Sequence, residues 1–338
     1  MSIKTEGRGY YLADEIAECQ ISIPLMDIYE SEYPIFSNDA FRTLTKQQKK
    51  DLIISEVNKV ITKTGHDMKI SWHDNLPQEI VTMPEIVEKK HFGKILAKSI
   101  NLQNADQLSL GVRYDDLGIF NIHIGHEIPF WTVLGPRSNG KSSFLLALIY
   151  YIEQIRPDKC KFTYINFKKS PISRIADNFS NITVISETEQ ISSCCQNFCE
   201  ELNQDPENFH VLLLDDLGTP FVNNNQPIIQ ALKTLGENLS MIHNENFLIV
   251  ISDMVSNLKA PQAFSSPLIK LFQQSQKGIF FSADDYDMQW FNVRISLSQK
   301  KMFTMTPGRG FFVNKGKPEH IQAPYIIPED FKDFSGTR

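Results

Sequence analysis

The spacing of apolar residues changes along the chain and predicts where strands and helices alternate. From about residue 107 onward, short apolar runs are separated by segments in which apolar residues recur every three or four positions. Short runs are typical of strands, and the longer period is typical of helices. Strands are predicted at 108–112, 119–124, 129–134, 162–167, 182–185, 210–214, 247–251, 278–281, 290–295 and 311–313, and helices at 141–155, 188–203 and 227–243.

Two of these strands lack the usual alternation of apolar and polar residues. The segments 210–214 and 247–251 are almost continuously apolar, as strands buried on both faces of a parallel sheet are. Strands that take turns with helices predict a doubly wound α/β fold, in which helices flank a mostly parallel central sheet.

The first third of the chain has a different pattern. Residues 1–14 are predicted to form a short aromatic strand preceded by glycines, and residues 15–106 a mostly helical linker region. The clearest helix begins at Thr45, because Thr45 and Gln48 have the spacing of a capping box. Gly65 stands where a helix would end.

Composition narrows the class of protein. The chain has 338 residues, of which 41% are hydrophobic and 22% charged, and its net charge is −6. This is a soluble globular composition, and the negative charge argues against a nucleic-acid partner. The longest apolar run, 144–152, is too short to cross a bilayer, and no signal peptide is visible. Five cysteines without framework spacing predict free thiols in a reducing compartment.

One motif carries specific chemistry. The stretch from Gly135 to Ser142 fits G-x-x-x-x-G-K-[ST] and lies between a predicted strand and a predicted helix. In such a loop the main-chain N–H groups bind phosphates, the lysine reaches the β- and γ-phosphates, and the serine hydroxyl ligates Mg²⁺. The alternative is a chance match in a turn. We predict that ATP is held by Gly135, Pro136, Arg137, Ser138, Asn139, Gly140, Lys141, Ser142 and Ser143.

The interior of this loop is less open than phosphate binding favours. Pro136 has no N–H to donate, and Arg137 is bulky where the main chain should approach a phosphate closely. Arg137 could contact a phosphate or block it. The motif therefore predicts nucleotide binding, and its interior predicts low affinity.

A second element follows the apolar strand at 210–214. In a P-loop enzyme the first acid after such a strand holds Mg²⁺ and the second activates the attacking water. We assign these roles to Asp215 and Asp216, which makes Ser142 and Asp215 the predicted metal ligands and Asp216 the predicted catalytic residue. The alternative is a strand end with two solvated acids.

The strand at 247–251 is followed by a possible phosphate sensor. Ser252 can donate a hydrogen bond to a γ-phosphate, whereas Asp253 would repel one unless its side chain points away. A sensing role and a structural role both stay open at this position.

Taken together, these segments resemble the FtsK/SpoIIIE family of P-loop ATPases, and within it the EssC/EccC ATPases of type VII secretion. The resemblance runs from about residue 7 to 325. Besides the phosphate loop and the acidic strand end, it rests on the segments Trp72–Pro77 (WHDNLP), Leu110–Asp116 (LGVRYDD) and Thr306–Phe312 (TPGRGFF).

The resemblance implies a RecA-like P-loop fold and the third, C-terminal ATPase module of a tandem array. Residues 7–12 (GRGYYL) repeat the phrase at 308–313 (GRGFFV). The first copy would be the closing strand of a preceding module, outside the central sheet and packed beside the linker. The implied domains are this strand (1–14), a helical linker (15–106), the ATPase domain (107–325) and a tail (326–338).

The family's partners follow from the same resemblance. It implies ATP and Mg²⁺ as cofactors, and as partners secreted type VII substrates, other secretion components and further modules of the parent chain. It implies a hexameric parent at the cytoplasmic side of the membrane, with this fragment soluble and monomeric. Recognition and export of small secreted proteins would be its function.

Departures from the family keep other functions open. Ser138 stands where the family has Gly, Asp216 where it has Glu, and Ser252-Asp253 where DNA translocases have Thr-Gln. These weaken the expectation of ATP hydrolysis. The alternatives are an inactive module for substrate binding and assembly, and an FtsK-like DNA translocase, which the net charge disfavours.

Two further features have two interpretations each. Arg294 and Arg309 are candidates for an arginine finger that acts on a neighbouring subunit, and purely structural roles are equally open. The segment 261–277 could line a pocket for the signal of a secreted partner, or it could be an ordinary core helix.

Overall fold

The computed structural model describes 8–13, 16–22, 83–99, 107–124, 129–168, 170–242 and 246–332, together with Thr45, Gln47, Gln48, Asp51, Ser55 and Lys59. The chain divides into two compact units, Met1–Thr82 and Met83–Arg338, and each is described by itself.

The first unit contains a hairpin of β1 (Arg8–Ala13) and β2 (Ile16–Ser22), which pair antiparallel as a two-stranded sheet of their own. The expectation that the first aromatic strand stays out of the central sheet is confirmed. Its packing beside the linker stays a prediction. The strand β2 corrects the prediction of a helical segment, because Ala17, Cys19 and Ile21 alternate with polar residues, as in a strand.

The capping box at Thr45 is confirmed. The main-chain N–H of Gln48 donates to the Thr45 hydroxyl (3.4 Å), and Gln48 Oε1 accepts from the main-chain N–H of Thr45 (3.0 Å). Gln47, Gln48, Asp51, Ser55 and Lys59 are helical. The proposed end at Gly65 lies outside the described residues.

One ten-stranded sheet organises the second unit, in the order β5–β4–β13–β12–β11–β6–β10–β9–β7–β8. Six neighbouring strands, from β11 to β8, run parallel, and β12, β13, β4 and β5 continue the sheet antiparallel. The strands are β4 (Gln107–Arg113), β5 (Ile119–His123), β6 (Phe130–Leu134), β7 (Cys160–Asn166), β8 (Ile182–Ile185), β9 (Phe209–Asp215), β10 (Phe247–Asp253), β11 (Gly278–Phe280), β12 (Arg309–Asn314) and β13 (Lys317–Gln322). A small parallel pair joins β3 (Val87–Glu88) to β14 (Pro324–Tyr325).

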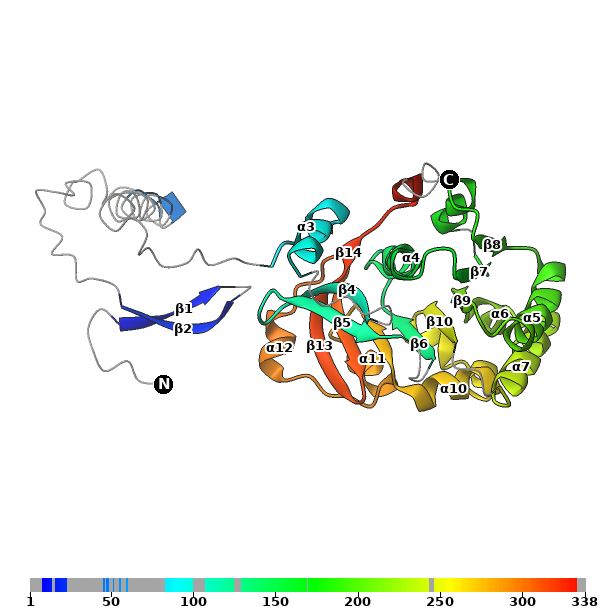
Figure 1. Cartoon of the computed structure of the whole chain (residues 1–338). Helices are drawn as coiled ribbons and strands as arrows, with labels where there is room; N and C mark the ends of the chain where they lie inside the picture. Colours follow the sequence, from blue (N-terminus) through cyan, green and yellow to red (C-terminus); the bar gives the residue numbers. More distant parts are fainter. Residues whose placement is uncertain are drawn as a thin grey trace, which may run out of the picture. The chain divides into compact units, whose positions relative to one another are not determined.

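Helices cover both faces of this sheet, so the predicted α/β fold with a mostly parallel centre is confirmed (Figure 1). One core contains buried residues of α3, α4, η4 and η5, and the other contains those of α5, α7, α10 and α11. The helices are α3 (Lys89–Ser99), α4 (Lys141–Ile155), η4 (Pro171–Asp177), α5 (Thr188–Gln204), α6 (Thr219–Val222), α7 (Gln226–Leu239), α8 (Val255–Leu258), α9 (Pro261–Phe264), α10 (Pro267–Ser275), α11 (Asp285–Trp290), α12 (Leu297–Met302) and η5 (Pro328–Phe331).

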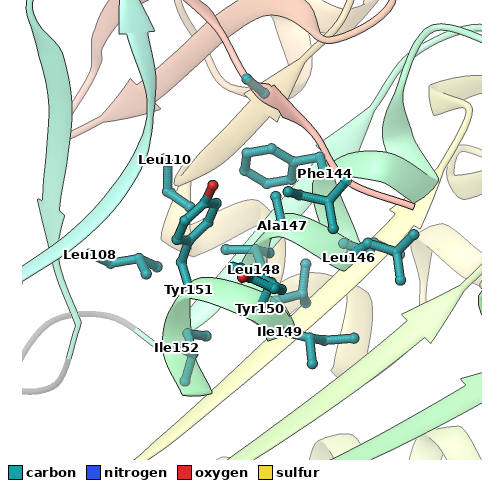
Figure 2. Close-up of a cluster of buried hydrophobic side chains, with 14 of the residues drawn as sticks. Leu108, Leu110, Phe144, Leu146, Ala147, Leu148, Ile149, Tyr150, Tyr151 and Ile152 are labelled. Carbon is teal, nitrogen blue, oxygen red and sulfur yellow. The ribbon is translucent and has the colours of Figure 1, made fainter. Parts of the chain in front are cut away.

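The most apolar helix, α4, directly follows the phosphate loop. Every residue from Phe144 to Ile152 is buried. Figure 2 shows the side chains from Leu146 to Ile152, with Phe144, gathered with Leu108 and Leu110 of β4. A helix that is apolar all round must be covered on every side. The buried helix α4 therefore anchors the end of the loop to the core. Within the described parts of the chain, no helix has the length and apolar character to cross a bilayer.

One predicted strand is wrong. The segment 290–295 leaves α11 and continues without regular structure. Phe291, Val293 and Ile295 are buried and alternate with exposed residues, which imitates a strand, but no neighbouring strand pairs with them. Asn292, with φ of 51°, turns the chain there.

Candidate functional site at the phosphate loop

The predicted phosphate loop lies where the carboxyl ends of several parallel strands meet. It follows β6, which has β10 on one side and β11 on the other. The chain after β6 passes β10 and β9 and returns to the sheet as β7. Such a reversal of strand order leaves a crevice at the carboxyl edge, where open α/β sheets bind ligands.

Three loop residues have φ angles that non-glycine residues rarely adopt. Gly140, the N-cap of α4, has φ of 98°, and Gly135 has φ of 154°. Ser138 also has a left-handed φ, of 64°. Serine tolerates this conformation less well than glycine does, so the loop carries local strain.

Lys141 lies at the first position of α4 and folds back over the loop. Its Nζ donates to the carbonyls of Gly135 and Pro136, both at 2.8 Å. Burial lowers the pKa of this ammonium, and four carboxylates oppose that shift, those of Asp216, Asp253, Asp215 and Asp287. The charges of four acids therefore act on this partly buried cation: two follow β9, one ends β10 and one lies on α11.

Asp215 ends β9 and is buried, with 4% of its surface exposed. The Tyr164 hydroxyl donates to its Oδ2 at 2.8 Å. Burial raises the pKa of this carboxyl to about 6, and the hydrogen bond from Tyr164 opposes the rise. A carboxyl held in this way keeps acceptor capacity for a cation, because one phenol satisfies only part of it.

Asp216 is the next residue and is partly exposed. Its φ of 55° is left-handed, a conformation in which Asp is enriched among non-glycine residues. Because of this turn, the two neighbouring acids have different surroundings. Asp215 lies within the sheet, and Asp216 lies beyond its edge. Asp216 is the carboxylate that acts most strongly on Lys141.

Asp253, at the possible sensor position, is completely buried, and its carboxylate accepts hydrogen bonds from three donors of the surrounding chain. Its Oδ2 accepts from the Gly218 N–H (2.5 Å), and its Oδ1 accepts from the Met254 N–H (2.6 Å) and from Asn257 Nδ2 (2.7 Å). Burial raises its pKa, and these donors oppose the rise. The carboxylate thus fixes the turn that follows Asp216. Ser252 pairs in register with Asp215 on the neighbouring strand.

Sequence reasoning missed Asp287. It lies on α11, just after β11, and its Oδ2 accepts from the Ser282 hydroxyl at 2.5 Å. Burial raises its pKa. A signal was present, because an acid shortly after a parallel strand is expected at the carboxyl edge. It also missed Tyr164, which no local motif marks.

The two serines after Lys141 differ in their surroundings. Ser142 is exposed, whereas the Ser143 hydroxyl donates to the Ile326 carbonyl (3.1 Å) and accepts from the Ile326 N–H (3.0 Å). The Ser143 side chain is thus already bonded to the C-terminal segment. Arg137 is exposed on the loop.

The two arginine-finger candidates also differ. Arg309 is 1% exposed and donates to Gln322 Oε1 (3.2 Å), to the Pro84 carbonyl (3.3 Å) and to the Thr304 hydroxyl. It cannot reach a neighbouring subunit, so its role is structural. Arg294 is exposed.

A cavity of about 650 Å³ lies away from the loop, beside the edge strand β8. It opens between β7, β8 and α5 and is lined by Lys161, Thr183, Cys194, Asn197 and Glu201 among others. Residues of 261–277 do not line it. They form α9 and α10, and Leu268, Ile269 and Phe272 of α10 are buried in the core.

The residues at the loop fit a magnesium nucleotide chemically. A left-handed glycine, Gly140, precedes a helix N-terminus, which is the geometry that directs N–H groups at phosphates. Mg²⁺ bound with substrate phosphates needs only one or two carboxylates, and Asp215 has spare acceptor capacity. The four acids would repel a nucleotide without its cation.

Comparisons with known proteins place the fold. No family model and no curated protein matches the sequence. Among solved structures, the Thermomonospora curvata EccC (ATPases 2 and 3), in complex with a signal sequence peptide, matches at 16% identity and a TM-score of 0.56 over 79% of this chain and 48% of that one. EssC (ATPases 2 and 3) from Geobacillus thermodenitrificans matches at 14% and 0.55, over 80% and 50%.

A conjugation coupling protein has the same fold. The pCW3 protein TcpA, solved as a monomer with ATPγS, matches at 12% identity and a TM-score of 0.52, over 82% of this chain and 86% of that one. This chain spans about half the length of the EccC and EssC structures. The predicted RecA-like P-loop fold is confirmed, and the likeness to structures of type VII secretion ATPase domains agrees with the sequence resemblance.

Proposed function

We propose that this chain is a nucleotide-binding module of a type VII secretion ATPase, equivalent to the third ATPase module of EssC/EccC proteins. The observation that carries the proposal is the position of Lys141 at the start of α4, among the strand-end acids Asp215 and Asp216. The likeness to EccC and EssC domains supports the class of parent protein.

Each residue of the site has a separate role in this proposal. N–H groups of the loop from Gly135 to Ser143 and the Lys141 ammonium bind the phosphates. Ser142 and Asp215 hold Mg²⁺, which supplies charge neutralisation when bound. Asp216 orients the attacking water. Lys141 must then leave the carbonyls of Gly135 and Pro136, to which it is bonded in this structure.

Weak nucleotide binding is part of the proposal. Ser138 strains the loop, the Lys141 ammonium already has two carbonyl partners, and four acids surround it. All three features weaken the binding of a polyphosphate. A bound cation would relieve only one of them, the repulsion between the acids and the phosphates.

We further propose that the module recognises small secreted proteins, as part of a parent chain at the cytoplasmic side of the membrane. The parent would be a hexamer with further ATPase modules. The EccC structure contains a signal sequence peptide, and the cavity beside β8 is the candidate surface on this chain. Replacing Asn197 by Trp would narrow the cavity and should weaken peptide binding. Unchanged binding would exclude this surface.

A second function is favoured by the same loop geometry. If the strain at Ser138 and the acids prevent binding, the module would serve substrate binding and assembly without hydrolysis. Nothing in the net charge of −6 favours a nucleic-acid partner.

Calorimetry separates the two functions. ATP is titrated into the chain with Mg²⁺, and turnover is then measured. Binding that disappears in Lys141→Ala would support the nucleotide-binding module. Absence of binding at millimolar ATP, in the chain and in its assembled parent, would leave only the binding and assembly function.

A further inference from the structure

The phosphate loop is hydrogen-bonded to a segment near Phe281, which lies more than 140 residues later in the chain. Asn139 Nδ2 donates to the Phe281 carbonyl at 3.0 Å, and the Phe281 N–H donates to the Leu134 carbonyl at 2.9 Å. Phe281, just after β11, therefore bonds both to the residue before the loop and to the loop's tip. These two bonds therefore set the distance between Leu134, after which the loop begins, and Asn139.

A second attachment joins the tip to the turn before β12. The Gly308 N–H donates to the Asn139 carbonyl at 3.0 Å. Gly140 and Gly308 lie back to back, since a Cβ atom on Gly140 would stand 2.4 Å from Gly308 N. Gly308 itself has φ of 84°. Glycine is thus required at position 140 by the close approach, and it is favoured at position 308 by the left-handed φ.

The turn at Gly308 is itself held firmly. The Ala323 N–H donates to the Gly308 carbonyl (2.8 Å), and Gln322 Nε2 donates to the Pro307 carbonyl (2.9 Å). Arg309, the next residue, is buried and donates to the Pro84 carbonyl. The contacts therefore continue from the loop tip through β12 to the first residues of this unit.

We propose that Asn139 and Gly308 form a latch that sets the shape of the phosphate loop, with the hairpin β12–β13 as its support. The structural part of this proposal, that the two residues set the shape of the loop, does not depend on nucleotide binding. Its functional part rests on the nucleotide binding proposed above. The side chain and carbonyl of Asn139 and the Gly308 N–H act as positioning groups: they hold the N–H groups of the loop in place, and in this role they do not touch the nucleotide.

The chain offers a matched pair of variants. Gly308→Ala puts a Cβ atom 3.1 Å from both the Ala323 carbonyl oxygen and Gln322 Nε2, so the turn or these neighbours must shift by a few tenths of an ångström, which disturbs the bond to Asn139. Gly316→Ala is the control: Gly316 lies at the other end of the same hairpin, with φ of 75° and nothing within 4 Å of its Cβ position. Both replacements carry the same left-handed strain.

Hydrogen exchange without nucleotide tests the latch directly. We expect the amides of 135–143 to exchange about tenfold faster in Gly308→Ala, which corresponds to about 1.4 kcal/mol of local stability, and to be unchanged in Gly316→Ala. Asn139→Ala should accelerate the same amides. Equal exchange of these amides in the two glycine variants would overturn the proposal.

Binding of ATPγS with Mg²⁺ tests the functional part. Its Kd should rise about tenfold in Gly308→Ala and stay constant in Gly316→Ala. If Gly308→Ala does not fold, the unmodified chain decides: bound ATPγS should slow exchange of the Gly308 amide, and no slowing would refute the latch. If the unmodified chain binds no nucleotide, the proposed function fails, while exchange without nucleotide still tests the latch.

Discussion

The parallel and antiparallel halves of the ten-stranded sheet both bury polar side chains, but they arrange them differently. In the antiparallel half, Arg309 donates to three acceptors, and His320 is stacked on Phe311 and Tyr114. At the carboxyl edge of the parallel half, the charges of four carboxylates act on Lys141. Burial of polar groups alone therefore does not mark a site. Concentration of like charges without full pairing does.

The same distinction separates two acids within the parallel half. Asp253 accepts three hydrogen bonds and fixes a turn. Asp215, which is also buried, accepts a bond from Tyr164 and keeps capacity for a cation. We therefore assign Asp253 to structure and Asp215 to function, and the following experiments can break that assignment.

Removing the most completely paired group should have the largest effect on stability. Arg309→Met leaves the acceptors on Gln322, Thr304 and Pro84 without their donor, so the free energy of unfolding should fall by about 4 kcal/mol. Urea unfolding measures it. The exposed Arg294, replaced in the same way, is the control and should change little. Similar losses in both would contradict the structural role of Arg309.

Asp253→Ala comes next. It leaves the N–H groups of Gly218 and Met254 and the Asn257 amide without an acceptor, so we expect a loss of about 3 kcal/mol. Asp215→Ala leaves only one buried donor, the Tyr164 hydroxyl, without its acceptor, so we expect a smaller loss of about 1 kcal/mol. If the two variants lose the same stability, the two acids do not differ as described.

His320 predicts how stability depends on pH. Burial, with a smaller effect of Arg309, lowers the pKa of His320 to about 4. In the unfolded chain the value is near 6.5, so the unfolded state binds more protons between pH 4 and 6.5, and stability falls as pH drops through that window by roughly 2 to 3 kcal/mol. His320→Phe keeps the stacking and should flatten this part of the curve. An unaltered curve would show that His320 does not titrate as stated.

Ser138→Gly should have the smallest effect on stability. It removes the left-handed strain and should stabilise the chain by about 1 kcal/mol. Asp158→Gly, at another exposed position with φ of 58°, should give a similar gain. Only Ser138→Gly should tighten ATPγS binding in calorimetry. A matching change in Asp158→Gly would mean that loop strain does not limit affinity.

Local signals predicted much of this molecule. The bounds of α4 and β8 agree with the sequence prediction, because a capping glycine, a run of apolar residues and clear turn residues mark them. β13 was missed, since Lys317–Gln322 has too few apolar residues to alternate. The segment 290–295 has the alternation of a strand but no partner.

The residues of the candidate site also divide into those that the sequence predicted and those that it did not. The loop and the acids Asp215 and Asp216 are adjacent to recognisable strands, so a motif finds them. Asp253's structural role, the Tyr164 hydrogen bond and the contact of Asn139 with Gly308 depend on residues far apart in the chain. The sequence contains no local pattern that predicts such contacts.

The Mg²⁺ dependence of ATPγS binding tests the central claim most directly. Calorimetry is carried out with Mg²⁺ and with EDTA on the unmodified chain, on Asp215→Asn, and on Glu319→Gln, an exposed acid of the antiparallel half. We expect EDTA to weaken binding at least about tenfold in the unmodified chain and in Glu319→Gln, and to weaken it clearly less in Asp215→Asn, which loses one of the two proposed ligands of the ion. Binding that ignores Mg²⁺ in the unmodified chain, or a full Mg²⁺ effect in Asp215→Asn, would contradict the assignment of this edge as a magnesium nucleotide site.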